Sequence, residues 1–161
     1  MSRRDATTRV IAALEIGLAN AADATLIAEL SRDAIEHDLV WSWTPTRVRR
    51  AMSNPEINVA VARHAAGLVG FAILQYHDDD AHLALLAVRA EQRRRGVARA
   101  LMNWLDVTLQ IAGISAVKVD VREGNGPARA FYRALGFTEE RRTLGYYQQR
   151  ENAIHLLKSL R

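Results

Sequence analysis

The chain has 161 residues, of which 49% are hydrophobic and 25% are charged, and this is the composition of a soluble globular protein. No apolar run reaches the ~20 residues of a membrane span, and the N-terminal MSRRDATTRV lacks the apolar segment of a signal peptide. The absence of cysteine excludes disulfides and a cysteine nucleophile. We therefore expect one domain over residues 1–161, located in the cytoplasm.

The formal net charge of +4 comes with a local excess of arginine in the middle of the chain. The five arginines of this segment are Arg89, Arg93, Arg94, Arg95 and Arg99. A nucleic-acid interface usually carries basic residues along an extended stripe, whereas these arginines surround one turn. The pattern therefore favours a compact anionic ligand, and it makes a nucleic acid an unlikely partner.

The first part of the sequence predicts one strand and two helices. The apolar segment 10–18 is read as a strand, although its periodicity does not exclude a helix. Asn20 or Asp23 is a suitable N-cap for a helix that reaches about residue 37. Thr44-Pro45 is a helix start signal, and the second helix should end near Asn54-Pro55.

The rest of the chain predicts further strands and two longer helices. Three strand-like runs joined by polar turns indicate antiparallel pairs, at 57–63, 68–76 and 82–88. Then follow a helix at 96–111 closed by Gly113, a strand at 114–121, a helix at 125–135 closed by Gly136, and strands at 137–144 and 153–158 around a Gly145-Tyr146-Tyr147 loop. This order predicts an α/β domain with a mixed sheet.

The turn between the strand at 82–88 and the next helix is the first candidate site. Arg93 to Ala98 read RRRGVA, which fits the pattern R-x-x-G-x-A. Gly96 has no Cβ to obstruct an anion, and the free N–H groups at the start of a helix attract negative charge. The pattern therefore predicts a pyrophosphate site, and the alternative is a solvated run of charges before a helix.

A second motif lies in the segment 125–137, which reads NGPARAFYRALGF. Its spacing N-x-x-A-x-x-F-Y-x-x-L-G-F puts Asn125 and Tyr132 two helical turns apart, on one predicted face. The two motifs, in this order, resemble the GNAT (GCN5-related) N-acetyltransferase superfamily. Within it, the segment 119–137 followed by RRTLGYY resembles the RimI-type ribosomal-protein alanine acetyltransferases and the N-terminal acetyltransferases.

The resemblance covers about residues 57–157 and implies a mixed, mostly antiparallel sheet of about seven strands with about four helices. It also implies a splayed strand pair that holds coenzyme A. Two positions depart from the family pattern: Ala98 stands where many members have a second glycine, and Arg94 replaces a frequent small residue. Neither change should prevent phosphate binding.

The same resemblance implies roles for individual residues. The main chain of Leu86, Ala87 and Val88 would pair with the pantetheine arm of acetyl-CoA. Asn125 would bind the cofactor near that arm, and Tyr132 would donate its phenol proton to the departing thiolate. The pyrophosphate would lie on the loop formed by Arg93, Arg94, Arg95, Gly96, Val97 and Ala98.

Asp120 falls at the position of the family's proposed base, where a glutamate is usual. An α-amine with a pKa of ~8 costs only ~1.4 kcal/mol to deprotonate at pH 7, against ~4.6 kcal/mol for a lysine amine. A shorter carboxylate acting through water would therefore suffice for an α-amine. The alternative is that Asp120 faces solvent and pairs with Lys118 and Arg122, its neighbours on the same strand face. His82 and Glu123 are lesser candidates for the base.

Aromatic residues are the candidates for the acceptor site. Trp41 and Trp43 lie between the first two helices, where the resemblance implies substrate recognition, and Tyr146 and Tyr147 lie in the predicted last loop. Each is also an ordinary core or rim residue. The histidines, His37 and His77 among them, have no spacing for a metal, and we expect no metal site.

The leading hypothesis is direct acetyl transfer from acetyl-CoA to a primary amine, most often a protein or peptide N-terminus. A small amine such as an amino acid, a polyamine or an aminoglycoside is the alternative acceptor. Two other classes stay open: a non-catalytic CoA-binding module, and an RNA-facing protein that uses the arginines. We expect no membrane partner, and a monomer or a homodimer.

Overall fold

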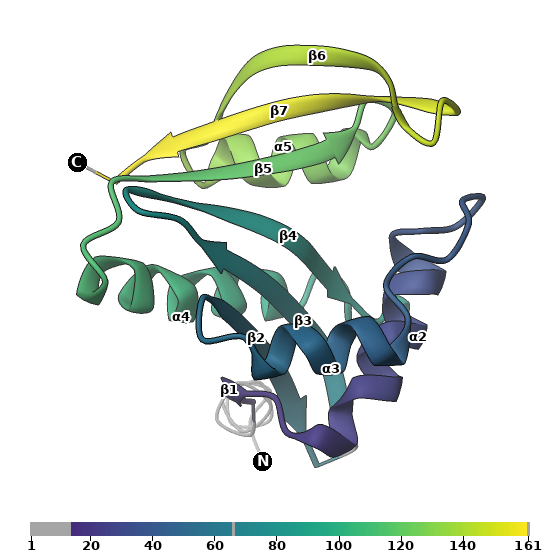
Figure 1. Ribbon diagram of the computed structural model, residues 1–161, viewed down its shortest axis with the longest axis vertical. Helices are drawn as coiled ribbons and strands as arrows, with labels where there is room; N and C mark the ends of the chain where they lie inside the picture. The colour runs from purple at the N-terminus through teal and green to yellow at the C-terminus, as the bar shows by residue number, and fades with distance from the viewer. Residues whose placement is uncertain (1–13, 66, 161) are drawn as a thin grey trace, which may run out of the picture. The chain divides into compact units, whose positions relative to one another are not determined.

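The computed structural model describes residues 14–65 and 67–160, and the elements below are those of this part of the chain (Figure 1). The strands are β1 Glu15–Leu18, β2 Ile57–His64, β3 Gly67–Tyr76, β4 Asp80–Val88, β5 Ala116–Arg122, β6 Thr138–Tyr147 and β7 Glu151–Ser159. The helices are α2 Ala24–Ala34, α3 Pro45–Ser53, α4 Val97–Ile111 and α5 Gly126–Ala134, with short 3-10 turns η1 Ala21–Asp23 and η2 Ala90–Gln92.

The strands form a seven-stranded mixed sheet in the order β1-β2-β3-β4-β5-β7-β6. β1 pairs antiparallel with β2, and β7 pairs antiparallel with both β5 and β6. β4 and β5 are parallel, and their ladder runs from Asp80–Ala116 to Leu83–Val119 and ends there. The predicted α/β fold with a mostly antiparallel sheet of seven strands and four helices is confirmed.

The chain divides into two compact units, each described here by itself. The first unit contains the described residues up to Ile73 together with Leu85–Asp106, and the second contains Leu74–Ala84 and the chain from Val107 onward. The boundary falls inside β3, β4 and α4, so the first half of β4 belongs to the second unit and the other half to the first.

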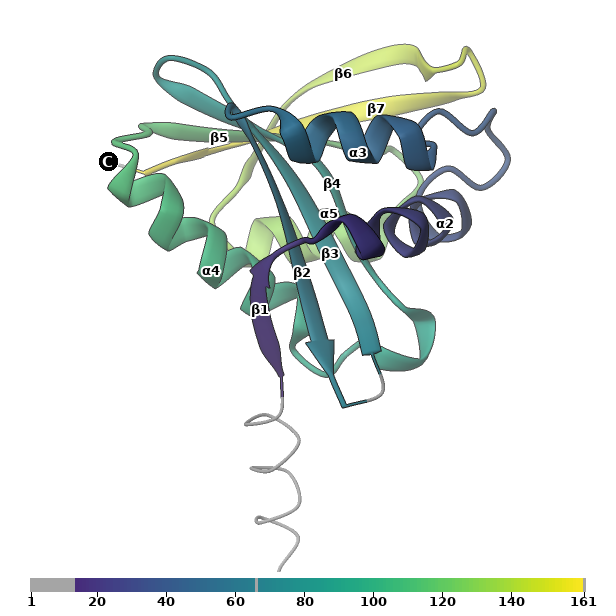
Figure 2. The same cartoon turned by 60° about the horizontal axis from the view of Figure 1, so that its bottom comes forward.

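In the first unit, α2 packs on α3, and α3 packs on β2. Thr44 caps α3 because its side chain accepts from the backbone N–H of Arg47, and Pro45 is the first helical residue, as predicted. Val48 and Ala51 are the buried residues of this helix. Figure 2 shows β1 beside β2, in line with their antiparallel ladder.

The start of the first helical segment is fixed by a capping box, with Asn20 as N-cap and Asp23 as its reciprocal partner. Asp23 also accepts from both terminal nitrogens of Arg63 on β2, at 2.8 and 2.7 Å. These hydrogen bonds outweigh burial and lower the pKa of the Asp23 carboxyl. The cap predicted from sequence is confirmed, and the helix it begins is divided into η1 and α2.

In the second unit, α5 contacts β6, and Figure 1 shows it lying along the layer of β5, β7 and β6. Residues on β5 alternate as predicted: Val117, Val119 and Val121 are buried, whereas Asp120 faces the opposite side with partial exposure. This alternation decides which β5 side chains are available for chemistry.

Two expectations about element bounds are corrected. Tyr146 and Tyr147 were expected in a loop, but β6 continues through both, and the turn comes at residues 148–150. The reason is a tight turn in which Gln148 and Gln149 both have positive φ, of 53° and 62°. Of the expected strand at 10–18, the structure has β1 at Glu15–Leu18, and residues 10–13 lie outside the described part.

Candidate functional site

The basic turn has the backbone of an anion-binding loop. Arg94 and Gly96 have positive φ of 62° and 82°, whereas Arg93 is extended. Alternation of this kind turns successive N–H groups toward one point and forms an anion-binding concavity. A Cβ at Gly96 would meet nothing within 4 Å, so the space beside it is open. The loop residues therefore fit a diphosphate.

The start of α4 supplies further donors to this loop. The first N–H groups of a helix have no intrahelical partner, and Val97 is the first residue of α4. Ala98, in the first turn, is partly buried. Because its side chain is only a methyl group, it does not obstruct the approach to these N–H groups. The loop and the helix start therefore present several N–H donors and the positive end of a helix dipole.

The five arginines divide into two groups. Arg89 Nε donates to the carbonyl of Leu68 on β3 at 2.6 Å, and Arg93 Nε donates to the carbonyl of Val88 at 3.3 Å. These two side chains fasten the turn to its own strands. Arg94, Arg95 and Arg99 are exposed and available to an anion, and Arg93 is exposed as well, although its Nε is engaged with Val88.

The second half of β4 carries the three residues expected to contact the pantetheine arm. Leu86 is partly exposed, whereas Ala87 and Val88 are buried. The β4–β5 ladder ends before these residues, at Leu83–Val119. Their backbone groups therefore lie beyond the paired part of the two strands.

Gly70 on β3 was not identified from the sequence. A Cβ at this position would lie 3.0 Å from the carbonyl oxygen of Ala87, 3.2 Å from Val97 and 3.3 Å from Val88. Gly70 therefore allows β3 to approach both the end of β4 and the start of α4. A single glycine within an apolar strand gives no sequence signal that distinguishes this close approach from a bulge.

Asn125 is the N-cap of α5, and its side-chain oxygen accepts from the N–H of Ala128 at 3.1 Å. The expectation that it lies on one helical face with Tyr132 is wrong, because Asn125 is outside the helix. Its amide nitrogen takes no part in this cap, and it remains our candidate cofactor contact.

Tyr132 is buried in an aromatic cluster on α5. Its ring makes edge contacts with Phe131 and Phe137, with centroids 5.2 and 5.3 Å apart. Burial raises the pKa of the Tyr132 phenol above its ordinary value. The group therefore stays protonated at neutral pH and can donate a hydrogen bond, and its ring is held by the two aromatic neighbours.

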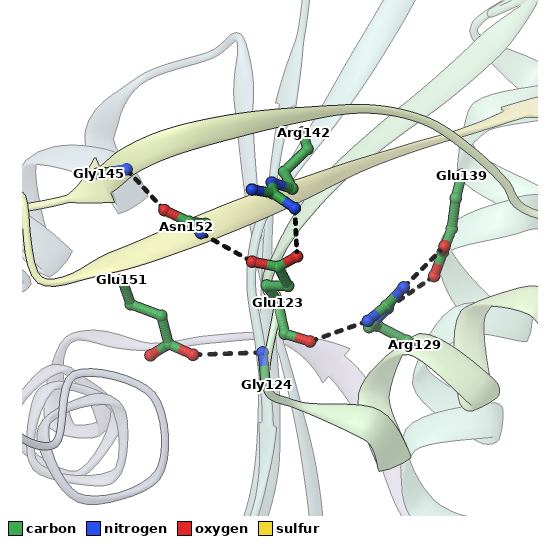
Figure 3. Close-up of polar contacts among 8 residues, drawn as sticks. All are labelled: Glu123, Gly124, Arg129, Glu139, Arg142, Gly145, Glu151 and Asn152. Carbon is green, nitrogen blue, oxygen red and sulfur yellow. Dashed lines mark hydrogen bonds and ion pairs between the residues drawn. The ribbon is translucent and has the colours of Figure 1, made fainter.

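A polar network fastens the loop between β5 and α5 to the β6–β7 hairpin (Figure 3). The Glu123 carboxylate accepts from Arg142 at 3.1 Å and from Asn152 at 2.8 Å. Asn152 in turn accepts from the N–H of Gly145, and Glu151 accepts from the N–H of Gly124. The Glu123 carboxylate thus joins the β5–α5 loop to both strands of the hairpin.

A bidentate ion pair completes the network. Arg129 on α5 contacts both carboxylate oxygens of Glu139 on β6, at 2.8 and 3.0 Å, and it also donates to the backbone carbonyl of Glu123. Such paired hydrogen bonds fix direction as well as distance. The helix that carries Tyr132 is thereby tied to both β6 and the β5–α5 loop (Figure 3).

Asp120 lies at the centre of a second polar cluster. Its Oδ2 accepts from Nε2 of His82 at 2.9 Å and from the Tyr146 hydroxyl at 3.1 Å, and its Oδ1 contacts Nδ1 of His155 at 2.5 Å. Burial alone raises the pKa of Asp120, but the hydrogen bonds and charges of the two histidines outweigh it and lower the pKa to about 2.

The structure gives Asp120 partners on three other strands, namely His82, His155 and Tyr146. Lys118 pairs with Asp80 at 2.9 Å and Arg122 pairs with Glu151 at 3.2 Å. A carboxyl of such low pKa is also a weak base, which argues against the expected role of Asp120.

His155 was missed in the sequence because its role depends on the β5–β7 register. It lies directly across from Asp120 in the antiparallel ladder, although the two are 35 residues apart in the chain. The one available signal was a polar residue within the apolar run of 153–157. Tyr146 packs edge-on against the His155 ring, with centroids 5.2 Å apart. The structure therefore brings Tyr146 and Asp120 together.

Tyr147 takes a separate position from Tyr146. Burial raises the pKa of its phenol, and the guanidinium of Arg122 lies 5.9 Å from its ring centroid. It is partly exposed on β6, and it lies one residue before the turn that ends the strand. It remains a candidate for the acceptor site.

The two tryptophans lie in the segment between α2 and α3. The guanidinium of Arg47 lies 3.8 Å from the ring centroid of Trp43, and the indole N–H of Trp41 donates to the carbonyl of Ala28 at 3.2 Å. The buried Glu36 carboxylate accepts from the backbone N–H groups of Ser42 and Trp43. This segment therefore has a defined conformation, and each tryptophan already has a contact within the first unit.

No group of three or more His, Cys, Asp or Glu residues in the described part is arranged to hold a metal ion. No helix in the same part is both long and apolar enough to cross a membrane.

A family model described as the acetyltransferase (GNAT) domain matches residues 55–139, which is more than half of the sequence. The match includes β4, the loop Arg93–Ala98, Asp120, Asn125 and Tyr132, which are the features just described. The chain therefore belongs to the GNAT acetyltransferase domain family.

Curated relatives and a solved structure agree with this assignment. The [ribosomal protein bS18]-alanine N-acetyltransferase of Escherichia coli K12 is 37% identical over 90 residues, which are 54% of this chain and 61% of the relative. The N-terminal acetyltransferase B catalytic subunit NAA20 of Arabidopsis thaliana is 36% identical over 80 residues, which are 49% and 46% of the two chains. The matches thus span about three fifths or less of these relatives.

The solved structure is that of the ribosomal-protein-S18-alanine N-acetyltransferase from Escherichia coli. It superposes with a TM-score of 0.79 at 26% identity, and the match covers 91% of this chain and 94% of that one. The likeness therefore extends over nearly the whole fold, beyond the segment that the family model matches.

Proposed function

We propose that this chain is an acetyl-CoA-dependent N-acetyltransferase that acetylates a protein or peptide N-terminal α-amine. Residues 1–161 would act as one catalytic domain in the cytoplasm. The names of two curated relatives support an N-terminal acceptor, and the family membership supports acetyl-CoA as the donor.

The observation that carries the proposal is the loop Arg93–Ala98 at the start of α4. Its open Gly96, its alternating backbone and the free N–H groups of the helix suit a diphosphate, which coenzyme A contains. The exposed Arg94, Arg95 and Arg99 add positive charge at this loop.

Acetyl-CoA supplies an activated thioester carbonyl, and the chain supplies orientation and proton handling. With no cysteine in the sequence, an acyl-enzyme on a thiol is excluded, so the amine would attack the thioester directly. Tyr132 would donate a hydrogen bond to the departing sulfur. Since burial raises the pKa of this phenol, it stabilises the thiolate by hydrogen bonding better than by complete proton transfer.

An α-amine suits this site better than a lysine amine. The α-amine needs ~1.4 kcal/mol to lose its proton at pH 7, whereas the lysine amine needs ~4.6 kcal/mol. The Asp120 carboxyl, whose pKa is lowered to about 2, is a weak base, and a weak base meets only the smaller cost. The charge state of the acceptor therefore favours an N-terminus.

The test is mass spectrometry of peptide and small-amine pools incubated with acetyl-CoA. We expect an increase of one acetyl group on peptide α-amines and little change on lysine side chains or free amino acids and polyamines. Acetylation confined to small amines would show that the acceptor is a small molecule and not a peptide. Binding of CoA without transfer to any amine would show that the chain is a non-catalytic CoA-binding module.

Tyr132→Phe tests the mechanism. We expect the rate constant kcat to fall at least tenfold while acetyl-CoA affinity, measured by calorimetry, stays within about twofold. Tyr76→Phe is the matched control, because it also removes a phenol hydroxyl, one that bonds to the hydroxyl of Thr108. Loss of acetyl-CoA affinity in Tyr132→Phe would instead assign the phenol a structural role.

A further inference from the structure

The cluster around Asp120 has a geometry that assigns a separate role to each member. It consists of His82 on β4, Asp120 on β5, His155 on β7 and Tyr146 on β6, all in the second unit. We propose that His82 is the base that takes the proton of the acceptor amine, and that Asp120 and His155 are positioning residues that hold it. This inference rests on the proposed acetyl transfer and names the proton acceptor for it.

Asp120 is unsuited to accept the proton itself. A carboxylate has about four acceptor positions, and three of these are already used by His82, Tyr146 and His155. Its pKa of about 2 lies about six units below that of an α-amine, so proton transfer would be unfavourable by about a millionfold. Asp120 therefore remains an anion throughout.

His82 has the free nitrogen that Asp120 lacks. Because an ionised carboxylate only accepts, the proton of the neutral imidazole lies on Nε2, and Nδ1 keeps its lone pair. The side chain is 33% exposed, which leaves Nδ1 open to an amine or to a bridging water. A ring nitrogen with a free lone pair is a better proton acceptor than the Asp120 carboxylate, whose pKa is lowered to about 2.

His155 cannot replace His82. Its Nδ1 contacts Asp120 and its Nε2 bonds to the Thr143 hydroxyl at 2.7 Å, so both ring nitrogens are occupied. The ring is also covered by Tyr146, and the side chain is only 12% exposed. His155 therefore holds the Asp120 carboxylate through Oδ1, which leaves Oδ2 directed at His82.

The remaining charges that face His82 in the second unit do not disturb this assignment. Lys118 lies directly across from His82 on β5, but its ammonium pairs with Asp80 at 2.9 Å. The titratable groups of β7 and β6 that contact Asp120 are His155 and Tyr146. Arg141 on β6 lies across from His155, and the charge of Asp120 also acts on the Tyr147 phenol. The net charge next to His82 is thus the anion of Asp120, which stabilises the imidazolium formed by proton transfer.

The proton balance of the step is complete. His82 takes one proton from the acceptor ammonium, which frees the amine lone pair to form the amide bond. The thioester bond breaks, and the second amine proton compensates the charge of the departing thiolate, which leaves as the thiol. His82 then releases its proton to solvent, so that each turnover yields one proton.

The experiment is the dependence of kcat/KM on pH for an N-terminal peptide, measured on the wild type and on His82→Gln, Asp120→Asn and His155→Gln. We expect His82→Gln to lower kcat/KM about 100-fold at pH 7, with the loss shrinking above pH 8, where the amine loses its own proton. His155→Gln should lower kcat/KM only several-fold. It should also shift the pH at which kcat/KM falls on the acidic side of the profile. Imidazole added to His82→Gly should restore part of the rate.

Controls separate this proposal from the proposed function. Acetyl-CoA affinity should be unchanged in all three variants, and His77→Gln, which replaces an exposed histidine in the turn before β4, should match the wild type. In the wild type, nitrogen NMR should find neutral His82 protonated on Nε2 and neutral His155 protonated on Nδ1. This measurement does not depend on the folding of any variant.

Two results would overturn the inference. The first is that His82→Gln keeps both its activity and the fall of kcat/KM at acidic pH, whereas Asp120→Asn loses both. Asp120 or a water would then be the base, and the proposed acetyl transfer would be unaffected. Neutral His82 protonated on Nδ1 in the NMR spectrum would also show that His82 is not the base. A wild-type chain that binds acetyl-CoA but acetylates no amine overturns both proposals together.

Discussion

A methyl group at position 70 would contact three atoms, which lie at the end of β4 and at the start of α4. Its position 3.0 Å from the carbonyl oxygen of Ala87 is tighter than most Cβ contacts, and Val88 and Val97 are nearly as close. The neighbouring backbone would have to give way by a few tenths of an ångström, because a carbonyl oxygen cannot rotate away as a side chain can. Gly70 therefore allows the close approach of β3 to the β4 end and the α4 start.

We expect Gly70→Ala to destabilise the fold by about 1–3 kcal/mol and to weaken acetyl-CoA binding several-fold. Gly17→Ala is the matched control, because a Cβ at Gly17 on β1 meets nothing within 4 Å. The measurements are chemical denaturation and calorimetric titration. Equal effects of the two substitutions would show that the close approach of β3 is not needed.

At the scale of elements, the loop before α4 contains a backbone feature that its sequence does not favour. Arg94 has a φ of 62°, a region that costs an L-residue about 1–2 kcal/mol. Arg95, its neighbour, is not among the residues with positive φ. Strain of this kind is found at ligand-binding sites, where surrounding structure maintains it.

This difference predicts opposite effects for two substitutions that remove the same charge. Arg94→Gly should leave stability unchanged or raise it by up to about 1 kcal/mol, whereas Arg95→Gly should lower it by about 0.5–1 kcal/mol. Acetyl-CoA affinity should fall to a similar extent in both, because each loses one exposed guanidinium. Thermal unfolding and calorimetry measure the two effects. Equal destabilisation would mean that the Arg94 backbone is not strained.

Local signals predicted most of the elements correctly. Thr44-Pro45 predicted the start of α3, and Gly113, with a φ of 72°, predicted the end of α4, because caps and left-handed residues depend on a few neighbouring positions. The hairpin end was mispredicted because two glutamines adopt the left-handed conformation that usually needs glycine or asparagine. Gly145 was therefore read as the turn.

The contacts of the candidate site depend on long-range pairing, which the sequence does not encode locally. Asp120 could be placed on the polar face of β5 from the alternation of valines, but its partner His155 follows from the register of β5 with β7. Gly70 likewise depends on how closely β3 approaches the chain at Ala87 and Val97. The family motifs predicted the site residues but not the contacts that orient them.

At the scale of the whole molecule, the half-buried, ionised Asp120 makes the stability of the fold depend on pH. Its pKa falls from 3.8 to about 2 in the folded chain, so the folded state favours the carboxylate. The resulting stability is fully present above pH ~4, and it is lost as the pH falls through about 2. Its size is about 1–2 kcal/mol when solvent screening is taken into account.

We therefore expect Asp120→Asn to be less stable than the wild type at pH 7 by about this amount, and the difference to shrink between pH 4 and pH 2. Denaturation curves at several pH values measure it. Asp78→Asn, in the exposed turn before β4, should follow the wild type at every pH. A constant difference down to pH 2 would assign the loss to packing and not to ionisation.

The two halves of the proposed reaction are encoded very differently along the gene. The donor loop and the strand before it occupy one uninterrupted stretch from Leu86 to Ala98, whereas the proton-handling side chains are contributed by four strands between His82 and His155. A short cassette could therefore carry donor recognition from one relative to another by a single exchange of coding sequence. The base and its supports would have to be transferred together, so engineering of a new acceptor has to begin with the sheet.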